Sequence, residues 1–304
     1  MDIRHLKYFV TTVKTGSFKQ AAEELCISQP AVSKAIKDLE EELGTPLLIR
    51  GARGVEITEL GNALFHRAKA ALTDLDNVKA EIKSKAKHQT LAIGTTAVPA
   101  AYFLPQVIPP FTARYPNIHL QVIGDVVDTV ISRVVLGELA FAIAPINPAL
   151  QDSGLIQRPL FDAPIAVLCS AQHPLASQSS ITHADLLDHP WIVSLEGTRP
   201  NQDFKRAFEA AHLPAPKSIV NSDNHLLIRS LLMKSRFLSL TPTPLYHNEL
   251  VSGQLAQLPI TMIGPQFLRY GLIYRQHTHI SEASQNFWRI MKEVAVADYL
   301  IQAG

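Results

Sequence analysis

The chain has 304 residues, of which 47% are hydrophobic and 18% charged, so it is a folded protein with room for a small domain and one or two larger ones. Residues 1–90 carry 14 Lys and Arg against 12 Asp and Glu, and the remainder carries 14 against 15. This near-neutral balance excludes bulk basicity as a reason for binding nucleic acid, which would depend on individually placed Arg and Lys side chains.

The first expected element is a helix over about residues 4–14. Its apolar side is formed by Leu6, Phe9, Val10 and Val13, which face a core shared with the next two helices. Arg4 lies at its start, where a guanidinium can reach a DNA phosphate.

Two short helices with a tight break follow within residues 17–43. Ser17 can cap the first, and Ser28 the second, by accepting from N–H groups that lack helical partners. Pro30 suits a first helical turn because it has no N–H to leave unpaired. The break therefore falls at residues 26–28, and the second helix begins at about Gln29.

The second helix has two different faces. Its buried seam is formed by Val32, Ile36, Leu39 and Leu43, and Gly44 supplies a left-handed stop. The opposite stripe carries Gln29, Ser33 and Lys37 with Lys34 beside it, side chains that can reach base edges or phosphates in a major groove. Residues 40–42, all Glu, are expected to be a solvated helix end facing away from DNA. The alternative is an ordinary helix pair whose polar face is merely solvated.

A strand, a basic turn and a second strand follow over residues 46–58, which predicts a wing. An Arg at the tip of such a hairpin can enter a minor groove or neutralise a phosphate. Arg53 is the candidate for the tip, with Arg50 nearer the DNA backbone. The candidate DNA contacts are thus Arg4, Ser17, Ser28, Gln29, Pro30, Ser33, Lys34, Lys37, Arg50 and Arg53.

These segments together resemble the winged helix-turn-helix of the LysR-type transcriptional regulators. The residues that carry the resemblance are 6–9, 16–18, 21–22, 28–33, Ile36, 39–40, 43–44, Leu47, Arg50, Arg53, 57–58 and Gly61. The chain departs from the pattern at Leu48, where many members carry Phe, a change that affects core packing more than the DNA face. The resemblance implies sequence-specific binding of double-stranded promoter DNA.

A long helix capped by Thr58 is expected next, ending in a polar hinge at residues 83–89. Its apolar positions alternate spacings of four and three, which is typical of a seam between two helices of different chains. The candidate dimerisation residues are Leu64, Ala68, Ala71, Leu75, Val78 and Ile82. The alternative is that this helix packs on its own domain.

From residue 90 strands alternate with helices, which implies mostly parallel sheets with helices on both faces. Two small α/β lobes result, with residues 163–169 and 266–274 as the runs that cross between them. The last helix, residues 283–300, is expected to return to the first lobe. This arrangement resembles the two-lobed, periplasmic-binding-protein-like effector domain of the same family, and residues 172–176 (Gln-His-Pro-Leu-Ala) are a further family-like sequence.

A small-molecule effector is expected between the lobes, where the carboxyl ends of strands and the N-termini of helices favour anions. The candidate contacts in the first lobe are Thr95, Thr96, Ala97, Val98, Asp125, Val126 and Ala144 with Pro145 beside it; those in the second are Thr198, Arg199 and Thr241. Arg199, placed in a loop after a strand, favours a carboxylate or sulfonate. For each residue, ordinary loop capping is the alternative.

Enzyme motifs are absent from the sequence, since it has no Gly-x-Ser-x-Gly, no phosphate-binding loop and no His-Glu-x-x-His. His277 and His279 come closest to metal-ligand spacing, but two surface histidines near a turn are the simpler interpretation. Cys26 and Cys169 have no resolving partner, and both are interpreted as small buried side chains in a reducing compartment. Neither a cofactor nor a membrane span is expected, and the cytoplasm is the expected location.

The leading hypothesis is a LysR-type regulator of α/β class with three parts. Residues 1–58 form an all-α winged helix-turn-helix, 59–89 a linker and dimerisation helix, and 90–304 the effector domain. Within the latter, lobe I covers about 90–162 and 270–304, and lobe II about 163–269. A homodimer through the linker helix, assembled as a homotetramer, is expected, with RNA polymerase a further candidate partner. The alternatives are a ligand-independent architectural DNA binder and a solute-binding or catalytic α/β protein with an incidental helical module.

Overall fold

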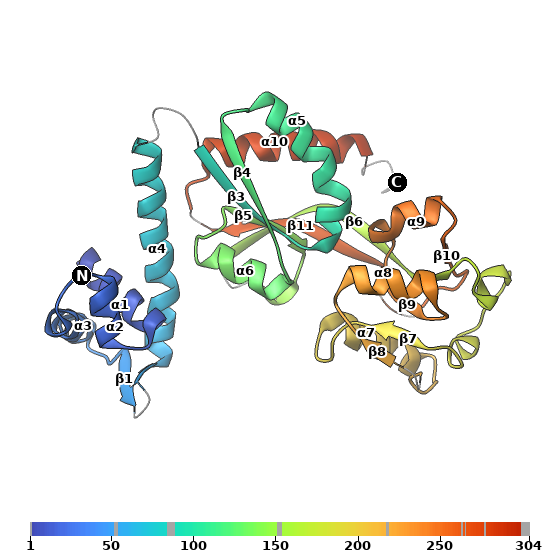
Figure 1. The fold of residues 1–304 in the computed structure, drawn as a ribbon, viewed down its shortest axis with the longest axis horizontal. Helices are drawn as coiled ribbons and strands as arrows, with labels where there is room; N and C mark the ends of the chain where they lie inside the picture. The colour runs from blue at the N-terminus through green and yellow to red at the C-terminus, as the bar shows by residue number, and fades with distance from the viewer. Residues whose placement is uncertain are drawn as a thin grey trace.

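The computed structural model describes residues 2–51, 54–83, 89–150, 154–216, 219–262, 264, 266–276 and 278–298. Figure 1 shows a small helical unit at the N-terminus, one long helix, and two α/β lobes side by side. The predicted fold class is therefore confirmed. Arg53 and His277 lie outside the described residues, as do the side chains of Arg50 and Ile82.

The N-terminal unit consists of α1 (Ile3–Thr15), α2 (Phe18–Glu24), α3 (Gln29–Leu43) and the hairpin β1 (Leu48–Gly51) and β2 (Gly54–Ile57). The predicted caps are confirmed: Ser17 accepts from the N–H of Gln20, and Ser28 from that of Ala31. Gly44 ends α3 in the left-handed conformation at φ 68°. The buried core contains Leu6, Phe9, Val10, Ala21, Ala22, Val32, Ile36, Leu39, Leu47 and Ala68.

Three expectations for this unit were wrong. Glu40 is half-buried, and its carboxylate accepts from the backbone N–H groups of Leu47 and Leu48, so it is not part of a solvated acidic run. Leu43 is exposed rather than part of the seam. Cys26 is also exposed, because it occupies a left-handed turn (φ 55°) between α2 and α3, whereas Cys169 is buried as expected.

The wing is an antiparallel hairpin in which Leu48 pairs with Ile57 and Gly51 with Gly54. It is fixed to the turn between α1 and α2, since Val55 donates to the carbonyl of Gly16 at 3.0 Å. A Cβ on Gly54 would lie 2.7 Å from that same oxygen, and its φ of +130° also disfavours other residues. The hairpin is thus held against the turn between α1 and α2 by Gly54 and Val55, next to its two tip residues, 52 and 53, which lie outside the described part.

The long helix is α4 (Glu59–Lys83), and the predicted cap is confirmed because Thr58 accepts from the N–H of Gly61 at 2.9 Å. The predicted seam was partly wrong. Leu64 and Ala68 pack, with Phe65 and Leu72, on the core of their own winged helix-turn-helix. Ala71 is exposed, as are Leu75 and Val78, whose exposed fractions are 38% and 49%. A regular apolar spacing identifies a stripe but does not identify its partner.

Lobe I contains the parallel strands β3 (Gln89–Thr95), β4 (Ile118–Gly124) and β5 (Phe141–Pro145), with the antiparallel β11 (Phe267–Arg275) and the first part of β6 (Leu155–Ser170). Its helical elements are η1 (Pro99–Phe103), α5 (Leu104–Arg114), α6 (Val127–Val135), η2 (Pro148–Leu150) and α10 (Glu282–Asp298). The helices α5 and α10 cover one face of the sheet and α6 the other.

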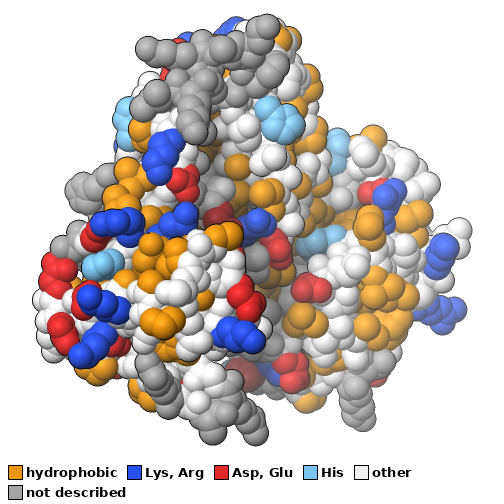
Figure 2. Space-filling model, turned by 60° about the vertical axis from the view of Figure 1, so that its left-hand side comes forward, with side chains coloured by type: hydrophobic (Ala, Val, Ile, Leu, Met, Phe, Trp, Pro, Cys, Tyr) orange, Lys and Arg blue, Asp and Glu red, His pale blue; other side chains and the backbone are white. Residues whose placement is uncertain are grey.

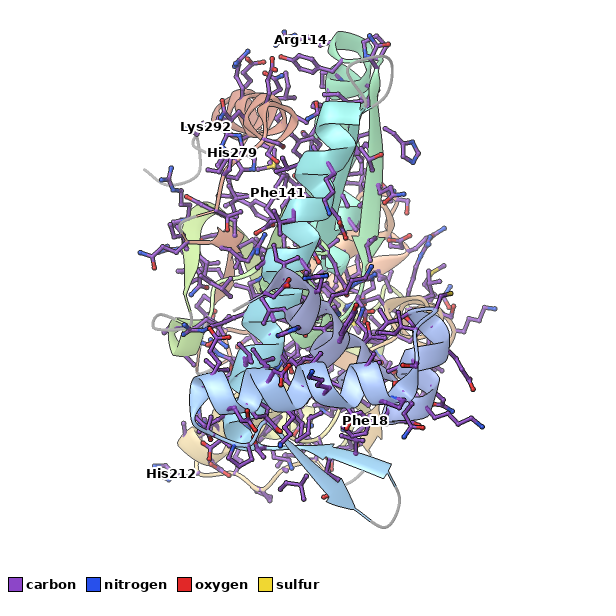
Figure 3. All side chains as sticks on the ribbon, turned by 90° about the vertical axis from the view of Figure 1, so that its left-hand side faces the viewer. Phe18, Arg114, Phe141, His212, His279 and Lys292 are labelled. Carbon is purple, nitrogen blue, oxygen red and sulfur yellow. The ribbon has the colours of Figure 1, made fainter. Side chains whose placement is uncertain are left out.

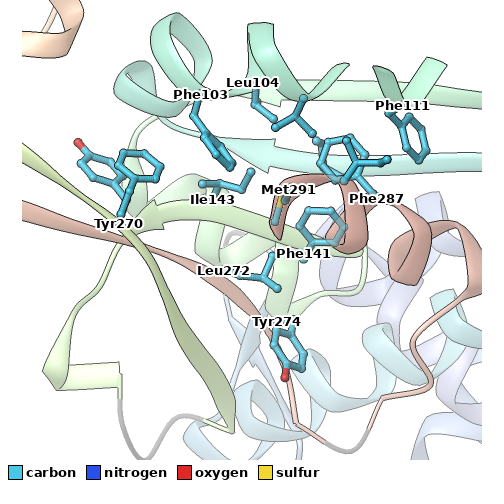
Figure 4. Close-up of a cluster of buried hydrophobic side chains, with 14 of the residues drawn as sticks. Phe103, Leu104, Phe111, Phe141, Ile143, Tyr270, Leu272, Tyr274, Phe287 and Met291 are labelled. Atoms are coloured by element: carbon cyan, nitrogen blue, oxygen red, sulfur yellow. The ribbon is translucent and has the colours of Figure 1, made fainter. Parts of the chain in front are cut away.

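Figure 4 shows the core beneath α5 and α10. Phe111 and Phe287 meet edge to face with ring centroids 4.8 Å apart, and Phe161 stacks on Tyr270 at 5.2 Å. Such pairs add to the free energy gained from burying the rings. Because α10 belongs to this core, the last helix does return to lobe I, as predicted.

Lobe II contains the parallel strands β7 (Trp191–Val193), β8 (Ile219–Asn221) and β9 (Leu238–Pro242), the rest of β6, and β10 (Leu255–Gln257). Its helical elements are η3 (Pro174–Ser177), η4 (Ala184–Leu186), α7 (Arg199–Ala210), α8 (His225–Lys234), η5 (Thr243–Tyr246) and α9 (His247–Val251). The strand order β4-β3-β5-β11-β6-β9-β7-β8 passes from one lobe to the other through β6. The two crossing segments predicted from the sequence are β6 and β11, which pair with each other.

Candidate DNA interface and effector edges

The exposed side of α3 carries most of the predicted base contacts. Gln29, Pro30, Lys34 and Lys37 are exposed and Ser33 is partly exposed, while the other side of the helix is buried in the core. Lys37 also lies 3.3 Å from Glu41, a surface ion pair of little energy that a phosphate could replace. The arrangement leaves the N-terminal half of α3 accessible to a major groove.

Two shallow hollows flank α3. The first, between α1 and α3, is lined by Arg4, His5, Tyr8, Ala31, Lys34, Ala35 and Asp38; the second, toward α2 and β1, by Phe18, Ser33, Ile36, Lys37, Glu40 and Leu48. A helix in a major groove runs between two phosphate backbones, so hollows on both of its sides fit that use. His5 and Tyr8 are surface positions that the sequence reasoning missed, because only the packing of α1 against α3 brings them beside Lys34.

Arg4 is less free than predicted. Its guanidinium donates to Asp2 from Nε at 3.0 Å and from Nη2 at 2.7 Å, while Asp2 also caps α1. These hydrogen bonds from Arg4 lower the pKa of Asp2 to about 2. A phosphate would therefore have to compete with Asp2 for Arg4. Figure 2 likewise shows Lys and Arg side chains interspersed with acidic ones on the face it presents.

In lobe I, the predicted effector residues gather at the carboxyl ends of β3, β4 and β5. The N–H of Thr96 donates to Ile143, and that of Asp125 donates to Thr95, so the three loops touch. The Oγ1 of Thr96 is buried and has no hydrogen-bond partner among the described residues. Asp125 is exposed and accepts from the N–H of Val126 at 2.8 Å.

Two of the predicted residues in this lobe can meet a ligand only through their backbone groups. Val98 and Ala144 are buried in the two hydrophobic cores of lobe I, so neither side chain faces a ligand. Ala97 is partly exposed and Val126 is exposed. The loops can still offer backbone groups, and the Thr96 hydroxyl remains the strongest side-chain candidate.

In lobe II, the predicted residues divide into one buried and two exposed positions. Thr241 is buried at the end of β9. Thr198 is exposed, and its hydroxyl donates to the carbonyl of Leu195 at 2.6 Å. Arg199 is the first residue of α7 rather than a loop residue, and it is exposed with its Nε 3.7 Å from Asp203. Its charge is thus already paired within the helix.

The same edge of lobe II carries polar residues that the sequence reasoning missed. Asn201 is buried and donates to the carbonyl of Ser194 at 2.8 Å, and Ser222 is buried at the end of β8. His225 begins α8 with Nδ1 3.5 Å from the hydroxyl of Tyr246, and burial lowers its pKa. Burial also raises the pKa of Tyr246 to about 12. Each of these four residues comes after the end of a strand in the sequence, and this position could have identified them as candidates.

The two edges lie next to each other. The element η1, which starts three residues after Thr96, contacts η5, which starts two residues after Thr241. The rings of Tyr102 and His247 lie 5.9 Å apart across this contact, and Leu245 packs against cores of both lobes. The carboxyl-end loops of the two parallel sheets are therefore brought together.

No group of three His, Cys, Asp or Glu side chains that could hold a metal ion occurs within the described residues. None of the described helices combines the length and the apolar character needed to cross a membrane.

Two family models match separate parts of the chain. Residues 3–62 match the family described as "Bacterial regulatory helix-turn-helix protein, lysR family", and residues 84–296 match the "LysR substrate binding domain". The chain is similar to the Hca operon transcriptional activator HcaR of Escherichia coli, with 30% identity over 86% of this chain and 87% of that protein. It is also similar to the SDS degradation transcriptional activation protein of a Pseudomonas species, with 28% identity over 93% of each chain.

The fold of the whole chain also matches solved structures. The full-length regulator LysG of Corynebacterium glutamicum with bound effector Arg has a TM-score of 0.69 at 18% identity, covering 98% of this chain and 99% of that one. A full-length variant of OxyR from Pseudomonas aeruginosa has a TM-score of 0.64 at 23% identity, covering 97% and 94%. Both family models together span nearly all of the chain, and the relatives are regulators rather than enzymes. The chain therefore belongs to the LysR family of transcriptional regulators, with a helix-turn-helix and an effector-binding domain.

Proposed function

We propose that this regulator reads a specific promoter sequence with α3 in the major groove, while the wing contacts the adjacent backbone or minor groove. The observation that carries the proposal is the capped N-terminal half of α3, where Gln29, Lys34 and Lys37 are exposed over a buried seam. Amide side chains can pair with adenine, and Lys with guanine or phosphate. In this division of the chain, residues 1–58 bind DNA, 59–89 dimerise and 90–304 bind the effector.

We propose a homodimer through α4. Leu60, Ala71, Leu75 and Val78 are exposed apolar residues of α4, and none of them is among the residues that pack on the winged helix-turn-helix core or form ion pairs with lobe I. A second copy of the same stripe would remove this apolar surface from water. Two-fold assembly also doubles the phosphate contacts, which a nearly neutral chain needs. As an extension of this proposal, two dimers assemble into a homotetramer. The tetramer acts in the cytoplasm and contacts RNA polymerase.

We propose that a small anionic effector binds between the facing edges of the lobes. The Oγ1 of Thr96, which is buried and has no hydrogen-bond partner within the described part of the chain, supports a ligand that accepts or donates there. Among the residues that the structure describes, no side chain caps the N-termini of η1 and α7, so their N–H groups favour negative charge. Arg199 can pair with an anionic ligand only if the ligand displaces Asp203. The helix N-termini therefore support an anion more strongly than Arg199 does.

Binding to the DNA upstream of its own gene tests the proposal. The purified full-length protein should shift and protect a two-fold symmetric site at modest ionic strength. A protein that leaves this DNA unshifted, with and without candidate metabolites, would defeat the assignment. A thermal-shift screen with carboxylates then separates a ligand-responsive regulator from an architectural DNA binder, because a ligand of the folded state must raise the melting temperature.

A further inference from the structure

The helix α4 touches two parts of the chain at once. One side, with Leu64, Phe65, Ala68 and Leu72, packs on the winged helix-turn-helix. Lys69 and Asp74 of the same helix form ion pairs with lobe I, and Ala70 near them is buried. Figure 3 shows α4 passing in front of lobe I in that view. Any movement of lobe I against α4 would therefore move the DNA-binding unit.

Two ion pairs hold α4 to lobe I. The Nζ of Lys69 lies 2.7 Å from Oε1 of Glu138, and the other oxygen of Glu138 accepts from Arg133 at 3.1 Å. Asp74 accepts from both terminal nitrogens of Arg275, at 2.6 and 3.1 Å. The hydrogen bond from Lys69, followed by that from Arg133, lowers the pKa of Glu138.

These pairs are partly shielded from water. The side chains of Lys69 and Arg275 are only 16% and 17% exposed, so salt screens them less than an ordinary surface pair. The side chain of Arg275 passes close to Gly137 on its way to Asp74. A Cβ at position 137 would lie 3.2 Å from Nη2 of Arg275. Gly137 also has a φ of +75°, so both the turn and the passage of Arg275 favour glycine there.

The two ion pairs have opposite polarity, and this fixes how α4 lies on lobe I. The helix supplies a cation at Lys69 and an anion at Asp74, and lobe I supplies the opposite charges at Glu138 and Arg275. Reversing the helix would bring like charges together. The contact thus selects one direction of α4 on lobe I.

In lobe I, the residues that pair with α4 are connected to the proposed effector edge through the helix α6 and the strand β11. The helix α6 starts beside Asp125 and ends with Arg133 in its last turn, next to Glu138. It packs on β3, β5 and β11, and β11 ends at Arg275. A displacement at the effector edge therefore has a direct mechanical route to both ion pairs.

Building on the proposed function, we propose that the pairs Lys69–Glu138 and Asp74–Arg275 form a latch that sets the position of the winged helix-turn-helix relative to lobe I. While the latch is closed, α4 and lobe I behave as one body. When it opens, the DNA-binding unit takes other positions, and the length of DNA that a dimer protects changes.

Amide hydrogen exchange of the full-length protein without DNA tests the latch directly. The variants are Asp74→Arg, Arg275→Asp and the double exchange, which restores opposite charges at the same two positions. Each single variant should raise the rate of amide exchange at residues 69–74 and 136–140 by about tenfold. Because the two positions contact each other, their effects should not add, and the double variant should return to within about twofold of the wild-type rate. Recovery in the double variant would also exclude general misfolding as the cause.

The matched control is Asp76→Arg, on the same helix, where Asp76 pairs only with the exposed Lys79 at 3.3 Å among the described residues. In this control variant, amide exchange at residues 69–74 and 136–140 should be as slow as in the wild type. Single variants that exchange no faster than this control, or a double variant as fast as the singles, would overturn the latch.

Footprinting on the upstream DNA tests the regulatory role. The single variants should change the protected length relative to the wild type, and the double should restore it; identical footprints in all of them would overturn the role of the latch in DNA binding. A wild-type protein that protects no DNA would instead defeat the proposed function, and the exchange experiment would still decide the latch.

Discussion

The carboxylate of Glu40 accepts a hydrogen bond from the backbone N–H of Leu47 at 2.7 Å, and the same oxygen accepts from Leu48 at 3.0 Å. This contact joins α3 to the first strand of the wing. Glu40→Ala would leave two partly buried donors without this acceptor, and we expect it to lower the free energy of unfolding by about 2 kcal/mol. Urea unfolding followed by circular dichroism would measure the change.

The control for this prediction is Glu41→Ala, the next residue along α3. Within the described residues, the one ion pair of Glu41 is a surface pair with Lys37 at 3.3 Å, so the loss of its carboxylate should change the free energy of unfolding by less than about 0.5 kcal/mol. Equal effects of the two substitutions would show that Glu40 is an ordinary surface acid.

Base and phosphate contacts on α3 should differ in how they respond to salt. Gln29→Ala should relax the preference at one base position by about 1–3 kcal/mol, because an amide that reads a base edge carries sequence information. Lys34→Ala should weaken all sequences alike and reduce the slope of log affinity against log salt by about one. Lys205→Ala, in lobe II, is the control, and operator titrations at several salt concentrations are the measurement. Wild-type behaviour of both α3 variants would refute the assignment of this face.

Local patterns in the sequence predicted the helices and their caps because they depend on neighbours within one turn. Ser17, Ser28, Thr58 and Gly44 all act as predicted. The role of Glu40 could not be predicted, because its partners lie seven and eight residues away and reach it only after the chain turns back.

The burial of single side chains was harder to predict where an element is covered on both sides. Val98 and Ala144 follow strand ends, as ligand contacts do, but helices on both faces of the sheet enclose them. Leu64 and Ala68 share a heptad-like stripe with Leu75, yet the winged helix-turn-helix covers only the first part of that stripe, and Leu75 is exposed. In both cases the sequence pattern showed that a surface is apolar, but only the tertiary arrangement decides what covers it.

The hydroxyl of Thr96 should contribute to ligand binding while lowering the stability of the fold. Because Oγ1 is buried without a partner among the described residues, Thr96→Val should raise the free energy of unfolding by about 1 kcal/mol while removing the melting shift caused by any carboxylate that the screen identifies. Thr95→Val should instead lower the free energy of unfolding, since the hydroxyl of Thr95 donates to the carbonyl of Thr96 at 3.1 Å. A full melting shift in Thr96→Val would remove Thr96 from the effector site.

His173 should make lobe II less stable in mild acid. Its Nδ1 accepts from the N–H of Leu175 at 3.1 Å, and burial, with the charges of His189 and Arg236 nearby, lowers its pKa below 6.5. The unfolded chain therefore takes up a proton that the folded chain does not, so the free energy of unfolding is largest above pH 6.5 and falls as the pH drops through that value. One such proton accounts for a slope of at most about 1.4 kcal/mol per pH unit. His173→Asn, which keeps an acceptor but cannot be protonated, should reduce the slope between about pH 7 and 5.5 in urea titrations, while the exposed His119→Asn should not; equal slopes in both variants would refute the prediction.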